Sequence, residues 1–220
     1  AYAIKRAAMA VGELAEAGEG LIAQANADGK VVRWRVGKEL TYFVRRSTFP
    51  GQAEYQTVVN NMRTATANWE TACNVKFKYL ADLDNNPNAG ADAAVFDVAY
   101  WPVNVDGYIA TAFFPDDPIE MRHVFVYPIY FSPQRYYDPI GVFRHELGHV
   151  LGFRHEQISA DAALDCRGEP PEITVALTDY DSISVMHYPC GEGGSQQMFI
   201  SDADRIGAQR VYGLPASDVE

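Results

Sequence analysis

The strongest hydrophobic pattern in the chain has the period of a helix and runs through residues 55–72. The apolar positions recur at helical spacing with polar residues between them: Tyr55, Val58, Val59, Met62, Ala65, Trp69 and Ala72. This spacing places them along one face of a helix. A stripe of aromatic and methionine side chains is more often core than a ligand site. We therefore predict a long amphipathic helix that packs this face into the core.

Short apolar segments around this helix have the pattern of strands. Residues 40–48 precede it, and residues 75–79 follow it with apolar side chains alternating with lysines, which is typical of a half-buried strand. Three more strands are predicted at residues 94–100, 109–114 and 123–130. Since a strand, a helix and a strand in this order connect by a right-handed crossover, we expect the first two strands to pair in parallel.

Two further helices are predicted nearer the C-terminus. Asp138 followed by Pro139 is typical of a helix start, because aspartate caps the free N–H groups and proline suits the first helical position. A similar cap at Ser201 precedes a helix over residues 202–212, which ends at Gly213. The chain between these two helices has little regular pattern.

The composition indicates a globular protein. A chain of 220 residues suits one domain with a sizeable core. The 48% hydrophobic and 21% charged content argues against disorder. The net charge of −11 argues against nucleic acid or an anionic membrane as a partner. No apolar run approaches the roughly 20 residues that span a bilayer.

Three cysteines are too few for a disulfide scaffold. Cys166 and Cys190 bracket part of the irregular region, so we predict a disulfide between them that holds this loop. Cys73 closes the long predicted helix, and we interpret it as a buried free thiol.

Residues 82–92 are rich in aspartate and asparagine and superficially suggest a calcium loop. Pro87 stands where an EF-hand loop needs glycine, and Ala93 stands where it needs a bidentate glutamate. We interpret the segment as a solvated turn, with calcium as the alternative.

The candidate chemistry lies in residues 145–156. His145 and His149 are four residues apart, so they share one face of a helix. Two imidazoles placed in this way can hold one divalent ion, and Glu146 between them can reach a water on it. Gly152 permits the positive φ that ends a helix, and the turn brings His155 round as a third ligand. Three protein ligands and one open position are the arrangement of a catalytic zinc site.

The motif His145-Glu146-x-x-His149-x-x-Gly152-x-x-His155 is the signature of the metzincin zinc endopeptidases, and the chain resembles that group. The same group carries a methionine turn downstream of the zinc motif. The sequence Ser-Val-Met-His-Tyr at residues 184–188 resembles that turn.

Features of two metzincin families are mixed in this chain. Glu156 after the third histidine and Tyr188 two places after the methionine are similar to astacins. Gly148 and Leu151 inside the zinc helix, with the segment 107–115, are similar to matrixins.

The resemblance implies a zinc-dependent endopeptidase that hydrolyses peptide bonds in extended polypeptides. In this reading zinc is held by the three histidines, and Glu146 is the general base that takes a proton from water. Tyr188 is expected to stabilise the reacting carbonyl and to act as an additional zinc ligand. Met186 is expected to form an apolar floor under the metal. The alternative is a non-catalytic zinc-binding module with the same fold, against which the intact Glu146 argues.

The resemblance also implies that the strand at residues 109–113 lines the substrate cleft. Its exposed edge has unpaired N–H and C=O groups to which an extended peptide can add. The candidate substrate-binding residues are Ile109, Ala110, Thr111, Ala112 and Phe113. His123 is read as an ordinary strand histidine, and His187 is given no role.

The fold implied by the resemblance is an α+β, metzincin-like catalytic domain in two lobes. The upper lobe is expected to hold a mixed, twisted sheet with two long helices above the cleft. The lower lobe is expected to be mostly irregular, with a C-terminal helix. We assign residues 34–213 to this domain, with the lobes dividing at about residue 152, and residues 214–220 to a tail.

Residues 1–33 are assigned to an N-terminal extension. Its residues 3–17 have helical spacing and are read as either an extra packing helix or the remnant of a pro-segment. The resemblance and the predicted disulfide together suggest a secreted or extracytoplasmic protein, although no signal peptide is visible. We expect a monomer whose partners are protein or peptide substrates.

Overall fold

The computed structural model describes residues 20–105, 108–133, 136–159, 161–162, 173–191 and 193–216. The predicted helix at residues 3–17 lies outside this part of the chain. Within it, three α-helices accompany two β-sheets. No helix of the described residues combines the length and the apolar character that crossing a membrane requires.

The larger sheet belongs to the upper lobe and has five strands. In spatial order they are β3 (Lys76–Tyr79), β2 (Glu39–Val44), β4 (Phe96–Tyr100), β6 (His123–Val126) and β5 (Ala110–Thr111). The pairings of β2 with β3, β2 with β4 and β4 with β6 are parallel, and β5 runs antiparallel to β6. The predicted mixed sheet and its parallel first pairing are therefore confirmed.

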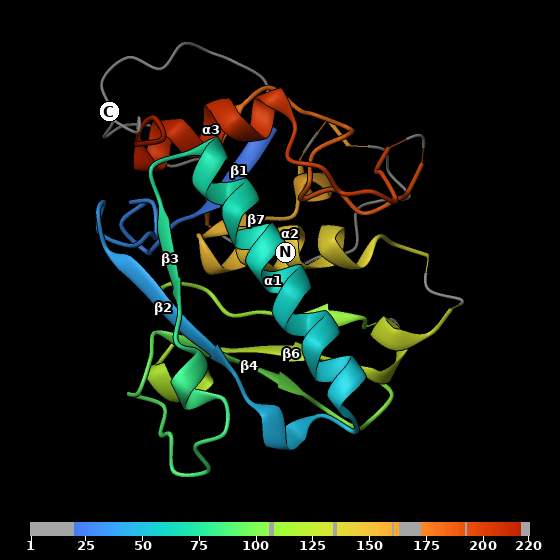
Figure 1. Ribbon diagram of the computed structural model, residues 1–220. Helices are drawn as coiled ribbons and strands as arrows, with labels where there is room; N and C mark the ends of the chain where they lie inside the picture. The colour runs from blue at the N-terminus through green and yellow to red at the C-terminus, as the bar shows by residue number, and fades with distance from the viewer. Residues whose placement is uncertain are drawn as a thin grey trace.

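Helix α1 (Gln52–Ala72) crosses one face of this sheet (Figure 1). The apolar stripe predicted from the sequence is the face that the helix buries, and Met62, Ala65 and Trp69 have no exposed surface. Trp69 also donates a hydrogen bond from Nε1 to the Arg144 carbonyl, 2.8 Å away. The indole thus ties α1 to the next helix while its ring fills the core.

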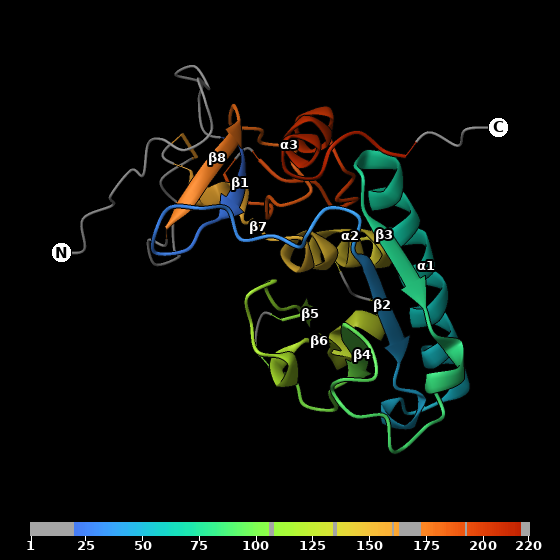
Figure 2. The ribbon, with the colours of Figure 1, turned by 90° about the vertical axis from the view of Figure 1, so that its left-hand side faces the viewer.

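Helix α2 (Pro139–Val150) lies between the two lobes. Figure 2 shows the five-stranded sheet on one side of α2, and β1, β7, β8 and α3 on the other side. All of its residues from Gly141 to Val150 are buried. A side chain on this helix can therefore contact elements of both lobes.

The lower lobe contains a sheet that the sequence did not reveal. Strand β1 (Gly20–Gln24) lies between β7 (Phe153–Arg154) and β8 (Thr174–Thr178) and pairs antiparallel with both. Helix α3 (Asp202–Tyr212) packs on this sheet, with Gly207 against Leu21. The described part of the predicted N-terminal extension therefore contributes the central strand of the lower lobe.

Candidate metal centre

The zinc-motif helix begins and ends as the sequence predicts. Asp138 caps α2 by accepting a hydrogen bond from the Gly141 N–H at 2.8 Å, and Pro139 is its first residue. Gly152, just past the end, has a φ of +95°, and a Cβ there would lie 2.4 Å from the Val32 carbonyl oxygen. Glycine is needed at this position for its backbone conformation and for the close approach of the chain at Val32.

The three histidines of the motif converge on one point. His155 Nε2 lies 3.0 Å from His149 Nε2 and 3.1 Å from His145 Nε2. Ligand nitrogens at zinc-like bond lengths in a tetrahedron would be about 3.3 Å apart, so this spacing suits one metal ion. Among the described residues these histidines are the one group of three or more histidine, cysteine or acidic side chains placed to share an ion.

Hydrogen bonds on the far side of two rings determine which nitrogen carries the proton. His145 Nδ1 lies 2.8 Å from the Val185 carbonyl oxygen, and His149 Nδ1 lies 2.8 Å from the Phe153 carbonyl oxygen. A carbonyl oxygen only accepts, so both Nδ1 atoms must carry a hydrogen. In the neutral rings, both Nε2 lone pairs then point at His155. A single proton on His155 Nε2 cannot satisfy two lone pairs, whereas a cation can.

Burial favours the neutral form of three ionisable side chains on α2. Burial and then the charge of His155 lower the pKa of His145 to about 3, and the same causes lower the pKa of His149 well below its usual value. Burial raises the pKa of Glu146 to about 8. The groups offered to a metal therefore include the two uncharged imidazoles of His145 and His149, on the same helix as a buried carboxyl group.

The predicted methionine turn lies directly beneath these histidines. Met186 is fully buried, and a Cβ on Gly148 would lie 2.2 Å from its Sδ atom. The Met186 carbonyl accepts a hydrogen bond from the Glu156 N–H at 3.0 Å, which ties the turn to the segment that carries His155. Gly148 is thus the helix position that leaves room for the methionine.

The Tyr188 ring lies beside the histidines. Its centroid is 4.9 Å from that of His145, with the rings stacked, and 4.4 Å from that of His155. The side chain is 39% exposed, so it stands at the surface of the site. Its backbone N–H donates to Gln157 Oε1 at 3.2 Å. Nothing in the local sequence pattern around Gln157 links this residue to the methionine turn, so its role could not be predicted.

His187 is a second residue near the site whose place the sequence did not indicate. It is fully buried, with Nδ1 2.6 Å from the Tyr188 carbonyl oxygen and Nε2 2.7 Å from the Tyr180 hydroxyl. The carbonyl can only accept, so Nδ1 carries the hydrogen and Nε2 accepts from Tyr180. Burial also lowers the pKa of His187, which agrees with a neutral ring that holds the backbone of Tyr188.

The predicted substrate-binding strand forms only in part. Of residues 109–113, only Ala110 and Thr111 belong to β5, which is the outermost strand on its side of the sheet. Ala110 and Phe113 are 7% and 3% exposed, so their side chains face the core. A substrate at this edge would therefore meet backbone groups and the partly buried Ile109, Thr111 and Ala112. The chain continues to Phe114, whose ring lies 5.3 Å from that of His149.

Asp84, in the polar loop at residues 82–92, connects this loop to the upper sheet and to α1 by hydrogen bonds. Asp84 is 2% exposed and accepts hydrogen bonds from the Val44 N–H and from the Tyr55 and Tyr79 hydroxyls. Its oxygens are thus engaged with the sheet and α1, which accords with the interpretation of a turn.

Cys73 is a buried free thiol as predicted, and burial raises its pKa to about 12. Cys166 lies outside the described residues, so its disulfide with Cys190 stays a prediction.

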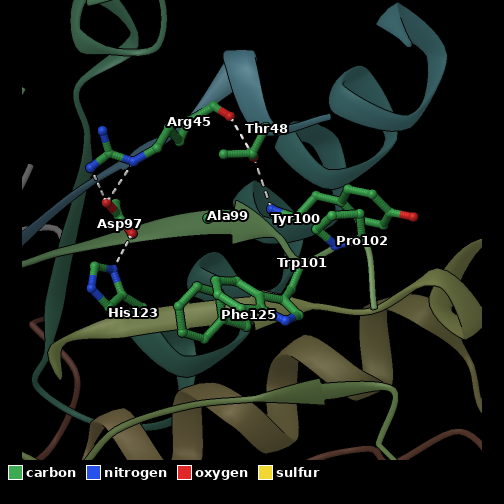
Figure 3. Close-up of a pocket in the computed structure, with 9 residues that line it drawn as sticks. All are labelled: Arg45, Thr48, Asp97, Ala99, Tyr100, Trp101, Pro102, His123 and Phe125. Carbon is green, nitrogen blue, oxygen red and sulfur yellow. Dashed lines mark hydrogen bonds and ion pairs between the residues drawn. The ribbon is translucent and has the colours of Figure 1, made fainter. Parts of the chain in front are cut away.

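The outer face of the upper sheet carries a charged cluster at one end of a hollow of about 460 Å³ (Figure 3). Asp97 lies between Arg45, which binds it from Nε at 3.0 Å, and His123, whose Nδ1 is 2.7 Å away. His123 Nε2 lies 2.9 Å from the Glu120 carbonyl oxygen. Both ring nitrogens thus face acceptors, and the hydrogen bond to Asp97 raises the pKa of His123. This strand histidine thus shares the Asp97 carboxylate with Arg45.

Comparison with known proteins identifies a fold. No family model matches the chain. No curated protein matches it in sequence. Among solved structures the chain is similar to myroilysin, with a TM-score of 0.55 and 16% sequence identity over 82% of this chain and 95% of that chain. At this identity the likeness shows a shared fold, and it confirms the predicted α+β, metzincin-like fold class.

Proposed function

We propose that this protein is a zinc-dependent endopeptidase acting on extended polypeptides. The observation that carries the proposal is the convergence of three imidazoles, of which His145 and His149 have their Nε2 lone pairs aimed at one point. Glu146 directly follows His145 on the same buried helix. A merely structural zinc site has four protein ligands and needs no base beside them.

The chain's residues divide the work of peptide hydrolysis among them. His145, His149 and His155 would hold the zinc ion, which when bound lowers the pKa of water toward neutrality and polarises a carbonyl. Glu146 takes a proton from the water that attacks the peptide carbonyl and passes it to the leaving amine.

Tyr188 and Met186 have supporting roles in this proposal. The Tyr188 hydroxyl donates a hydrogen bond to the carbonyl oxygen as negative charge develops on it, and the ring's position beside His145 and His155 supports this. The same position supports Tyr188 as an additional zinc ligand in the resting site. Met186 supplies an apolar floor and no chemistry.

The free edge of β5 is the feature that suits an extended peptide substrate. Its antiparallel pairing with β6 uses one side of the strand, and on the other side no described strand pairs with its backbone groups. A peptide that adds there lies along a path leading through Phe114 to His149. We therefore expect the protein to recognise the backbone of several successive residues of its peptide substrate.

Cleavage of a peptide library, followed by mass spectrometry and metal analysis of the same sample, tests this proposal. The zinc-loaded protein should cut internal peptide bonds, lose this activity to a chelator and regain it with added zinc. Stoichiometric zinc without any cleavage would instead favour the non-catalytic zinc-binding module. A protein that binds no zinc would contradict both functions.

A further inference from the structure

A buried carboxylate from the last helix reaches the methionine turn. Asp204 belongs to the first turn of α3 and has no exposed surface. Its Oδ2 atom accepts a hydrogen bond from the Val185 N–H at 2.8 Å, and its Oδ1 atom accepts one from the Ser184 hydroxyl at 2.6 Å. The Val185 carbonyl is the group that accepts from His145 Nδ1, so Asp204 is one residue removed from a proposed metal ligand.

Asp204 holds the peptide groups on both sides of Val185. It binds the Val185 N–H directly, which belongs to the peptide before that residue. The peptide after it joins the Val185 carbonyl to the Met186 N–H, and that N–H donates to Ser184 Oγ at 3.0 Å. Because Ser184 Oγ is itself held by Asp204, the carboxylate determines the direction of the carbonyl that faces His145.

The interior of the protein makes these bonds hard to replace. Ser184, Val185 and Asp204 are at most 1% exposed, so water cannot take over a lost partner. An ionised carboxylate only accepts hydrogen bonds, which matches the donors from Ser184, Val185 and the Ser201 N–H. Burial raises the pKa of Asp204 to about 6, so the group is ionised at neutral pH.

We propose that Asp204 is a positioning residue for the metal site, which orients His145 and sets its tautomer through the backbone of Val185. The proposal rests on His145 being a metal ligand, as in the proposed function. Partners of metal-binding histidines in the second layer around an ion are worth about 10- to 100-fold in metal affinity. A role limited to capping α3 would leave the affinity of a folded protein unchanged.

Ser201 provides a matched control for the capping role. Its hydroxyl accepts from the Asp204 N–H at 3.0 Å, which completes the capping box of α3, and donates to Asp181 at 2.6 Å. Ser201→Ala should lower the midpoint of unfolding through the lost cap. It leaves both acceptor oxygens for Ser184 and Val185 in place.

The test measures the zinc dissociation constant of the full chain by competition with a chelating indicator. The variants are Asp204→Asn, Asp204→Ala, Ser184→Ala and Ser201→Ala, each shown to be folded by circular dichroism. Asp204→Ala and Ser184→Ala should bind zinc about 10- to 100-fold more weakly. Asp204→Asn keeps one oxygen for the Val185 N–H and should lie between these variants and the wild type. Ser201→Ala should bind zinc like the wild type.

A second readout follows the tautomer itself in the metal-free protein. Nitrogen NMR should show a protonated Nδ1 on His145 in the wild type and in Ser201→Ala, and a mixture of tautomers in Asp204→Asn and Ser184→Ala. If Asp204→Ala fails to fold, these two milder variants decide the question. Equal zinc affinities and tautomers in all folded variants would overturn the proposal and leave the proposed function intact. A wild type without zinc affinity would instead overturn the proposed function.

Discussion

Replacing Gly148 by alanine should destabilise the protein, although alanine is the better helix former. Gly148 lies inside α2, where this exchange ordinarily stabilises a helix by about 1 kcal/mol. Here the new Cβ would meet Met186, with Sδ 2.2 Å and Cε 3.1 Å away. Met186 is fully buried, so it moves only if its surroundings repack, at a cost of about 1–3 kcal/mol. We expect a net loss of about 1 kcal/mol.

The contact with Met186 can be isolated by a double-mutant cycle. Met186→Ala removes the sulfur atom and should itself cost about 2–5 kcal/mol, as core truncations do. In that background nothing obstructs the new methyl group, so Gly148→Ala should stabilise the protein by about 1 kcal/mol. The sign of the alanine effect therefore reverses, and the coupling between the two positions is about 2 kcal/mol.

Urea denaturation of the metal-free protein measures all four corners of this cycle. In thermal unfolding each 1 kcal/mol should correspond to about 2–4 °C for a domain of this size. A stabilising effect of Gly148→Ala in the wild-type background would refute the reasoning, because it would show that the methionine turn does not press against α2. An alanine effect of the same size in both backgrounds would also refute it.

The remaining predictions concern Tyr188, His123 and Cys73. Tyr188→Phe should lower kcat/KM for a peptide about 10- to 100-fold, because a donor to the developing oxyanion is lost; unchanged kinetics would remove Tyr188 from the mechanism. The hydrogen bond to Asp97 raises the pKa of His123. The protonated ring therefore stabilises the folded protein fully below about pH 6.5, and this stabilisation is lost as the pH rises through the raised pKa. Urea titrations should show this decline, worth about 1 kcal/mol, in the wild type but not in His123→Gln. The buried Cys73 thiol should react with iodoacetamide at pH about 8 only after denaturation; labelling of the folded protein at that position would contradict its burial.

Local patterns predicted the elements that make the metal site. The cap at Asp138, the histidine spacing and the turn at Gly152 each depend on residues a few positions apart, and each has the predicted geometry. The apolar stripe of α1 was visible for the same reason, because helical contacts repeat within one segment. Such features can be predicted because the residues that determine them are close together in the sequence.

Contacts between distant segments could not be predicted in this way. Strand β1 is short, and its partners β7 and β8 lie far along the chain, so no local period reveals the lower sheet. Asp204 has the sequence context of a helix cap, and its bonds to Ser184 and Val185 arise only when α3 packs beneath the methionine turn. The predicted cap of α3 is confirmed, but the capping pattern does not indicate that the Asp204 carboxylate also binds the methionine turn.

The central claim is that three histidines hold a zinc ion beside a glutamate that moves the proton. Its most direct test pairs zinc stoichiometry with peptide hydrolysis in the wild type and in Glu146→Gln, which keeps the size of the side chain and removes its basicity. We predict one zinc per chain in both proteins, with a loss of about 1000-fold or more in kcat for the variant. Undiminished hydrolysis by Glu146→Gln, with zinc bound, would contradict this account.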